Sequence, residues 1–123
     1  MGLPGSGKTT LARQLSERLP AVWYNDSEIS NYFTESDSLE QARRMGILCD
    51  IALRNRVVSY AIADFVCPTE QTRKTFNPDY IIWMNTVTES DKVFEKPDFY
   101  NVEITSWDYD SDSIFEKIKL HDR

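Results

Sequence analysis

The stretch Gly2-Leu3-Pro4-Gly5-Ser6-Gly7-Lys8-Thr9 decides the fold class of this 123-residue sequence. It matches the phosphate-binding loop, or P-loop, G-x-x-x-x-G-K-[ST] at every fixed position. The second and third of its glycines allow the backbone to curl, so that successive N–H groups point toward a phosphate. From Lys8 to Leu19 apolar residues recur at helical spacing, which predicts the helix that normally follows such a loop.

The loop predicts a binding site for ATP and Mg²⁺. Lys8 is expected to reach the β- and γ-phosphates as a catalytic residue, and the Thr9 hydroxyl is expected to bind the metal. A chance glycine turn before a helix is the alternative, and the four matched positions argue against it. The predicted ATP-binding residues are Gly2, Leu3, Pro4, Gly5, Ser6, Gly7, Lys8, Thr9 and Thr10.

Short apolar runs alternate with helical patterns along the remainder of the chain. They predict strands over 21–24, 57–63, 80–84 and 100–105, helices over 38–55, 69–76 and 112–120, a helical turn ending at residue 32 and a loop over 34–38. This alternation predicts one α/β domain over residues 1–123, a P-loop kinase-like three-layer sandwich with a mostly parallel sheet. A buried strand normally precedes a P-loop, and here only Met1 does, so we expect that first strand to be missing from this chain.

Two aspartates at the ends of predicted strands are candidates for the catalytic site. Asp64 ends an apolar run and is predicted to hold Mg²⁺ together with Thr9, with capping of the next turn as its alternative role. Asp26 follows the strand at 21–24 and is predicted to orient or deprotonate an acceptor hydroxyl. Because the carboxyl ends of parallel strands face the ligand crevice, both aspartates are expected to reach it.

Composition limits the classes of function. The chain has 14 Lys and Arg against 20 Asp and Glu, a net charge of −6, which argues against a broad surface for DNA or RNA. Its longest apolar stretch, residues 57–66, is too short and too polar to span a membrane, and no signal peptide precedes the loop, so we expect a cytoplasmic protein. Cys49 and Cys67 lack metal or redox spacing and are expected to be buried thiols. A homodimer is left open.

The three tryptophans fall in different settings. Trp23 and Trp83 lie in predicted strands and are expected to be core residues. Trp107 lies in a polar connection, where the sequence leaves a core position and a ligand contact equally open.

Four segments resemble the adenylylsulfate kinase family of P-loop kinases. Residues 2–12 are similar to the start of that family, and residues 40–46, EQARRMG, resemble its E-N-x-R-R-x-G helix. Residues 63–69 take the place of a strand followed by a Ser-Pro turn, and residues 33–38 echo the segment F-S-x-x-D-R. The resemblance covers most of residues 2–84. It implies transfer of the γ-phosphate of ATP to the 3′-hydroxyl of adenylyl sulfate, a small-molecule nucleotide acceptor.

The resemblance also implies how the acceptor is held. Phe33 would stack on its adenine, Arg43 would contact its phosphosulfate, and Phe65 is a third predicted substrate contact. A core position for Phe33 and a solvated helix face for Arg43 are the alternatives. Ser30 and Ser38 stand where the family has arginines. These departures favour a second interpretation, a nucleotide-binding remnant or regulatory module without useful catalysis. A kinase acting on polynucleotide ends is the third, and the negative charge disfavours it.

Overall fold

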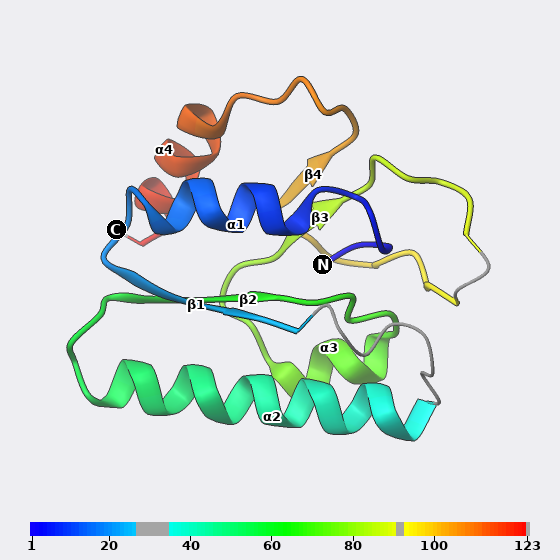
Figure 1. Ribbon diagram of the computed structural model, residues 1–123, viewed down its shortest axis with the longest axis horizontal. Helices are drawn as coiled ribbons and strands as arrows, with labels where there is room; N and C mark the ends of the chain where they lie inside the picture. The colour runs from blue at the N-terminus through cyan, green and yellow to red at the C-terminus, as the bar shows by residue number, and fades with distance from the viewer. Residues whose placement is uncertain (27–34, 91–92, 123) are drawn as a thin grey trace.

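The computed structural model describes residues 1–26, 35–90 and 93–122. In chain order its elements are α1 (Lys8–Ser16), β1 (Ala21–Asn25), α2 (Glu35–Arg54), β2 (Tyr60–Asp64), α3 (Glu70–Phe76), β3 (Ile82–Met84), β4 (Val102–Ile104) and α4 (Ser111–His121) (Figure 1). The helical turn predicted to end at residue 32 lies outside the described residues, as does Phe33.

The elements form three layers. Helix α1 contacts β1 and β2 from one side, with α4 beside it, whereas α2 covers the same strands from the other side and contacts α3 (Figure 1). Both strand pairs are parallel. The predicted α/β fold, with a parallel sheet between layers of helices, is confirmed.

The parallel sheet is split into two pairs, β1–β2 and β3–β4. Between the pairs lies Gly2, which makes a single parallel bridge with Met84. The Met1 amino group donates a hydrogen bond to the Ile82 carbonyl (2.9 Å), and the Gly2 N–H donates to the Val66 carbonyl on the β2 side (3.3 Å). Among the described residues no strand precedes α1. Met1 and Gly2 therefore mark the place, between β2 and β3, where such a strand would end.

A cavity of about 310 Å³ lies between the two strand pairs. Its lining is mainly apolar and includes Leu11, Leu15, Ile62, Ile82, Met84 and Ile118. Ile62 and Ile82 are only half-buried, although the strands of a parallel sheet are normally covered on both faces and read as fully buried runs. The middle of the sheet therefore contains apolar space that the described side chains do not fill.

Two groups of buried apolar side chains hold the layers together. The larger group joins α1, α4, β3 and β4 through residues such as Leu15, Met84 and Ile114. The smaller one joins α2 to the segment after β2, through Met45 and Phe65 among others. Ala21, Tyr60 and Ile62 on the β1–β2 side also pack against the larger group, so this group extends across the split in the sheet.

Several boundaries differ from the sequence-based expectation. The strand predicted over 57–63 runs from Tyr60 to Asp64, because Arg56 adopts a left-handed conformation (φ 57°) that ends the preceding helix. Val57 consequently lies in the turn and is 85% exposed. Helix α2 begins at Glu35, inside the predicted loop, and α1 ends at Ser16, before Leu19.

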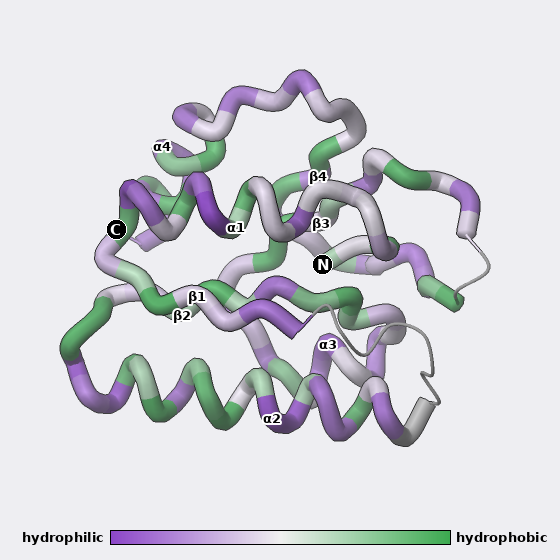
Figure 2. Tube along the Cα trace, viewed as in Figure 1, coloured by the Kyte–Doolittle hydropathy of each residue, from purple (hydrophilic) through white to green (hydrophobic). Residues whose placement is uncertain are grey.

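The outer side of α2 is unusually apolar for a surface helix. Its residues Ile47, Leu48 and Ile51 are between 40% and 50% exposed, and Figure 2 shows repeated apolar segments along this helix. In the described parts of the chain, no helix is long and apolar enough to cross a membrane. Cys49 and Cys67 are free and buried, as the sequence predicts.

Candidate nucleotide-binding site

The loop before α1 has the backbone shape that phosphate binding requires. Gly5 and Gly7 adopt positive φ angles of 79° and 96°, which only glycine adopts without strain. At Gly2 a Cβ atom would lie 2.6 Å from the Met84 carbonyl oxygen, so no side chain fits there. Helix α1 starts at Lys8 and has no side-chain cap. Its first N–H groups therefore point out of the helix, where a phosphate could accept their hydrogen bonds.

The Lys8 side chain folds over the P-loop. Its ammonium nitrogen Nζ donates a hydrogen bond to the Leu3 carbonyl (2.9 Å). Burial lowers the pKa of this ammonium group, and the negative charge of Asp64 opposes the shift.

Thr9, Asn25 and Asp64 form a hydrogen-bonded triangle in front of the loop. The Thr9 hydroxyl donates to the Asp64 carboxylate (2.9 Å), and the Asn25 side-chain amide donates to the same carboxylate oxygen (2.7 Å) and to the Thr9 hydroxyl (3.1 Å). Asn25 and Asp64 are register partners at the carboxyl ends of β1 and β2. Asp64 is 4% exposed, so its carboxylate is held in place by these two donors.

The oxygen atoms of this triangle suit Mg²⁺, which prefers hard oxygen ligands and is usually held by one or two carboxylates together with substrate phosphates. Thr9 and Asp64 supply one hydroxyl and one carboxylate. No group of three or more His, Cys, Asp or Glu side chains able to hold a metal occurs within the described residues. A metal here would therefore depend on oxygen atoms from a bound nucleotide and from water.

Solved structures with this arrangement of loop and strands are known. The APS (adenylyl sulfate) kinase CysC of Mycobacterium tuberculosis, in complex with AMPPNP and APS, matches with a TM-score of 0.70 at 15% identity over 98% of this chain and 93% of that chain. The hexameric APS kinase from Thiobacillus denitrificans gives 0.69 at 23% identity, over 98% of this chain and 27% of its own. This chain has the fold of the APS kinases. No protein-family model and no curated protein sequence matches it.

Within this APS kinase fold, Asp26 faces α2 rather than the loop. Its carboxylate lies 3.6 Å from an Arg44 guanidinium nitrogen, and its carbonyl accepts a hydrogen bond from the Gln41 side chain (3.1 Å). Asn25, one residue earlier, is the side chain that reaches Thr9 and Asp64. Sequence reasoning passed over Asn25 because an amide is neither an acid nor a base, although its position at the end of a strand was visible.

The predicted acceptor contacts are not brought together among the described residues. Arg43 lies on the exposed face of α2 and forms a close ion pair with Glu40 (2.6 Å). Phe65 is 3% exposed and packs edge-on against Phe76, with 5.2 Å between the ring centroids. Its ring therefore belongs to the core and is not open to a substrate. Phe33 lies outside the described residues.

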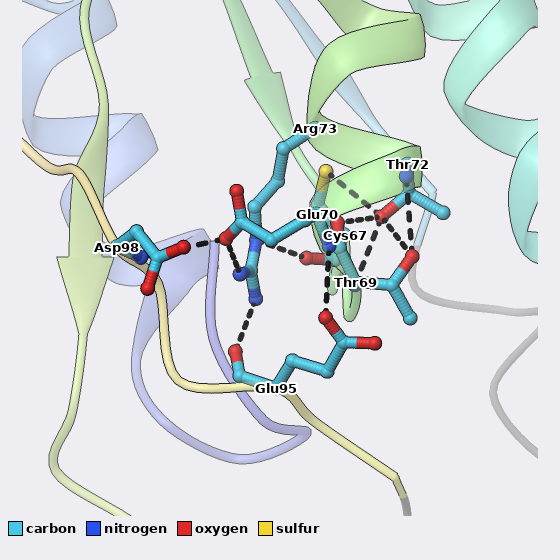
Figure 3. A network of polar contacts seen from close by, with 7 residues as sticks. All are labelled: Cys67, Thr69, Glu70, Thr72, Arg73, Glu95 and Asp98. Atoms are coloured by element: carbon cyan, nitrogen blue, oxygen red, sulfur yellow. Dashed lines mark hydrogen bonds and ion pairs between the residues drawn. The ribbon is translucent and has the colours of Figure 1, made fainter.

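A buried arginine holds the connection between β3 and β4 against α3, a feature that the sequence did not reveal. Arg73 is 5% exposed; it donates to the Cys67 carbonyl (3.1 Å), to the Glu95 carbonyl (2.6 Å) and to the Glu70 carboxylate (2.7 Å). Figure 3 shows these bonds converging on one guanidinium group. The same group lies over the Phe94 ring, 4.9 Å from its centroid. Near its start, just after β3, the same connection contacts the P-loop: the Thr86 hydroxyl donates to the Ser6 carbonyl (2.7 Å).

Proposed function

We propose that this protein transfers the γ-phosphate of ATP to a small hydroxyl acceptor, with adenylyl sulfate as that acceptor. The observation that carries the proposal is the hydrogen bond between Thr9 and Asp64 in front of a complete P-loop. A structural neighbour that is an APS kinase in complex with AMPPNP and APS supports both ligands. The proposed chemistry is in-line phosphoryl transfer, in which the protein mainly positions groups and neutralises charge.

Each residue of the candidate site has a defined role in this proposal. The loop N–H groups and Lys8 bind the β- and γ-phosphates, where negative charge shifts during transfer. Thr9 and Asp64 would hold Mg²⁺, which offsets phosphate charge when it is bound, and Asn25 keeps the Asp64 carboxylate oriented. Asp26 is proposed to orient the acceptor hydroxyl, and Arg43 to contact the phosphosulfate once it leaves Glu40.

A second candidate is nucleotide binding without useful catalysis. Two observations favour it: the sheet is split by a cavity, and Ser38, which stands where the resemblance places an arginine, is 5% exposed. A buried serine supplies no charge for a phosphosulfate. The same P-loop contacts to ATP are expected in both candidates, so they differ only in what happens to the γ-phosphate. The homodimer stays a prediction.

The first experiment tests nucleotide binding by thermal melting with Mg-ATP. A ligand at about 100 times its Kd adds roughly 2.7 kcal/mol to the free energy of unfolding, so the unmodified protein is expected to melt several degrees higher. Lys8→Ala is expected to remove most of this shift, whereas Lys74→Ala, an exposed lysine on α3, keeps it. If Mg-ATP does not change the melting temperature of the unmodified protein, both candidate functions are contradicted.

The second experiment separates the two candidates. Radiolabelled phosphate from ATP is expected on adenylyl sulfate with the unmodified protein, and Asp64→Asn is expected to lower the rate by about 10²-fold while ATP affinity changes little. Asp50→Asn, an exposed carboxylate on α2, serves as the control. Retained ATP binding with no labelled product, and no heat when adenylyl sulfate is titrated into the ADP complex, would leave the non-catalytic candidate as the function.

A further inference from the structure

An exposed tryptophan lies directly against the P-loop. Trp107 belongs to the connection between β4 and α4, and 57% of its surface is exposed. Its six-membered ring is so close to Gly7 that a Cβ atom there would lie 2.7 Å from ring atom Cζ3 and 3.0 Å from Cη2. Gly7 therefore needs to be glycine for two reasons, its positive φ angle and the indole that covers it.

The connection that carries Trp107 is attached at both ends. On one side the carbonyl of the buried residue Ile104 accepts a hydrogen bond from the Asn85 N–H (2.7 Å). On the other side the Tyr109 hydroxyl donates to the Gln14 side chain on α1 (3.0 Å), and Asp110 caps α4. The indole is thus held next to the loop by attachments to the residue after β3, to α1 and to α4, and it does not depend on a ligand for its position.

ATP is longer than the P-loop, so part of the bound nucleotide must lie on the protein surface next to the loop. If the phosphates lie on the loop N–H groups, the ribose and the base extend beyond them onto the neighbouring surface. Trp107 is an exposed aromatic ring in contact with that loop, whereas Tyr100, another exposed aromatic residue, packs against Trp83 at 5.4 Å between centroids. Aromatic side chains stack on nucleobases with little preference for one base, because every base has a π face.

We propose that Trp107 is the residue that stacks on the base of the bound nucleotide, an inference that rests on the nucleotide binding proposed above. The indole fixes the base while the P-loop fixes the phosphates, so that the γ-phosphate has one orientation toward the acceptor. This assigns a function to the exposure of Trp107. It also makes the protein selective for nucleotides over inorganic polyphosphates, but only weakly selective among bases.

The test compares two probes that share phosphates and differ in the base. Calorimetric titrations with Mg-ADP and with Mg-tripolyphosphate are made on the unmodified protein, Trp107→Ala, Trp107→Phe and the surface control Phe99→Ala. We expect Trp107→Ala to weaken ADP binding about 10- to 100-fold, the size of one lost stack, and to leave tripolyphosphate binding unchanged. Trp107→Phe and Phe99→Ala are expected to keep ADP binding within about threefold, because both retain an aromatic ring at position 107.

Three results would overturn the assignment in distinguishable ways. Unchanged ADP binding in Trp107→Ala removes any base contact. Equal weakening of both probes means that the indole only supports the shape of the loop. If the unmodified protein binds neither probe, the nucleotide site itself is absent and the inference fails with it. Quenching of tryptophan fluorescence by ADP but not by tripolyphosphate, lost in Trp107→Phe, gives an independent readout that a purely structural role does not produce.

Discussion

The amide of Asn25 sets the charge of the candidate site at the level of a single residue. Its Nδ2 atom donates to Asp64 at 2.7 Å, so this pair of strand ends contains one carboxyl group rather than two. A carboxylate in the same place would face Asp64 without a proton between them, and two carboxylates that close cannot both ionise without cost. The amide therefore holds the Asp64 carboxyl group in one orientation before any cation arrives.

Replacing Asn25 by aspartate is expected to destabilise the protein and to make its free energy of unfolding depend on Mg²⁺. Without Mg²⁺, Asn25→Asp should lower the free energy of unfolding by about 1–3 kcal/mol, through lost hydrogen bonds and repulsion of like charges. Millimolar Mg²⁺ should restore most of this loss, because the cation neutralises the new pair. Urea unfolding with and without Mg²⁺ measures both effects, and Asn55→Asp in the exposed turn after α2 is the control. An equal loss in both conditions would show that position 25 does not face a cation site.

At the scale of elements, α3 owes its position to Arg73 more than to its own length. The helix has seven residues, too few to be stable alone. Its first turn is closed by a capping box between Thr69 and Thr72, and its N-terminal Glu70 N–H is bonded to the Glu95 carboxylate (3.2 Å). The arginine then joins this turn to the connection that follows β3, so helix and connection are expected to come apart together.

Arg73→Met tests that coupling. The thioether chain fills much of the same volume but leaves the carbonyls of Cys67 and Glu95 without their donor, so we expect a loss of about 2–4 kcal/mol in urea unfolding. Limited proteolysis should then cut the chain within residues 93–98 sooner than in the unmodified protein. Lys74→Met, the exposed neighbour on the same helix, should change neither measurement. Lost stability with an unchanged cleavage pattern would mean that Arg73 supports α3 alone.

The elements were predictable from local periodicity, and the contacts between distant segments were not. The P-loop, the helix after it and the strand ending at Asp64 follow from fixed motif positions and apolar repeats. By contrast, the role of Arg73 depends on a hydrogen bond to the Glu95 carbonyl, 22 residues away. Asn25 rather than Asp26 reaches Asp64 because neighbouring side chains along a strand point in opposite directions. Phe65, which the resemblance implied as a substrate contact, lies in the core because it packs against Phe76, a contact between distant segments that local periodicity does not reveal.

At the scale of the whole molecule, the cavity between β2 and β3 limits stability. Apolar space of this kind deprives its lining of contacts, and filling it with apolar side chains is expected to stabilise the fold. An extension of about five β-branched residues joined to Met1 should therefore raise Tm, since Met1 already points into the space. An extension of equal length made of Gly and Asp is the control. If both extensions leave Tm unchanged, a strand does not enter the cavity.

The Met1 amino group makes stability depend on pH near neutrality. Burial lowers its pKa from 8.0 to about 6 in the folded chain. Between these values the unfolded chain binds more protons than the folded one, so the free energy of unfolding should rise by on the order of 2 kcal/mol from pH 6 to pH 8. Acetylation of Met1 removes the titrating group and should flatten this rise. The two proteins are compared by urea unfolding across the interval, and parallel curves would contradict the assignment.

The split sheet also affects how the backbone meets solvent. In a parallel strand successive N–H groups point alternately to the two neighbouring strands, and β2 has a strand partner on one side only among the described residues. Every second amide hydrogen of β2 should therefore exchange with deuterium far faster than the one before it. In most α/β proteins the middle of the sheet exchanges last. Here some fast-exchanging amides would lie at the centre of the sheet, beside some of the slowest.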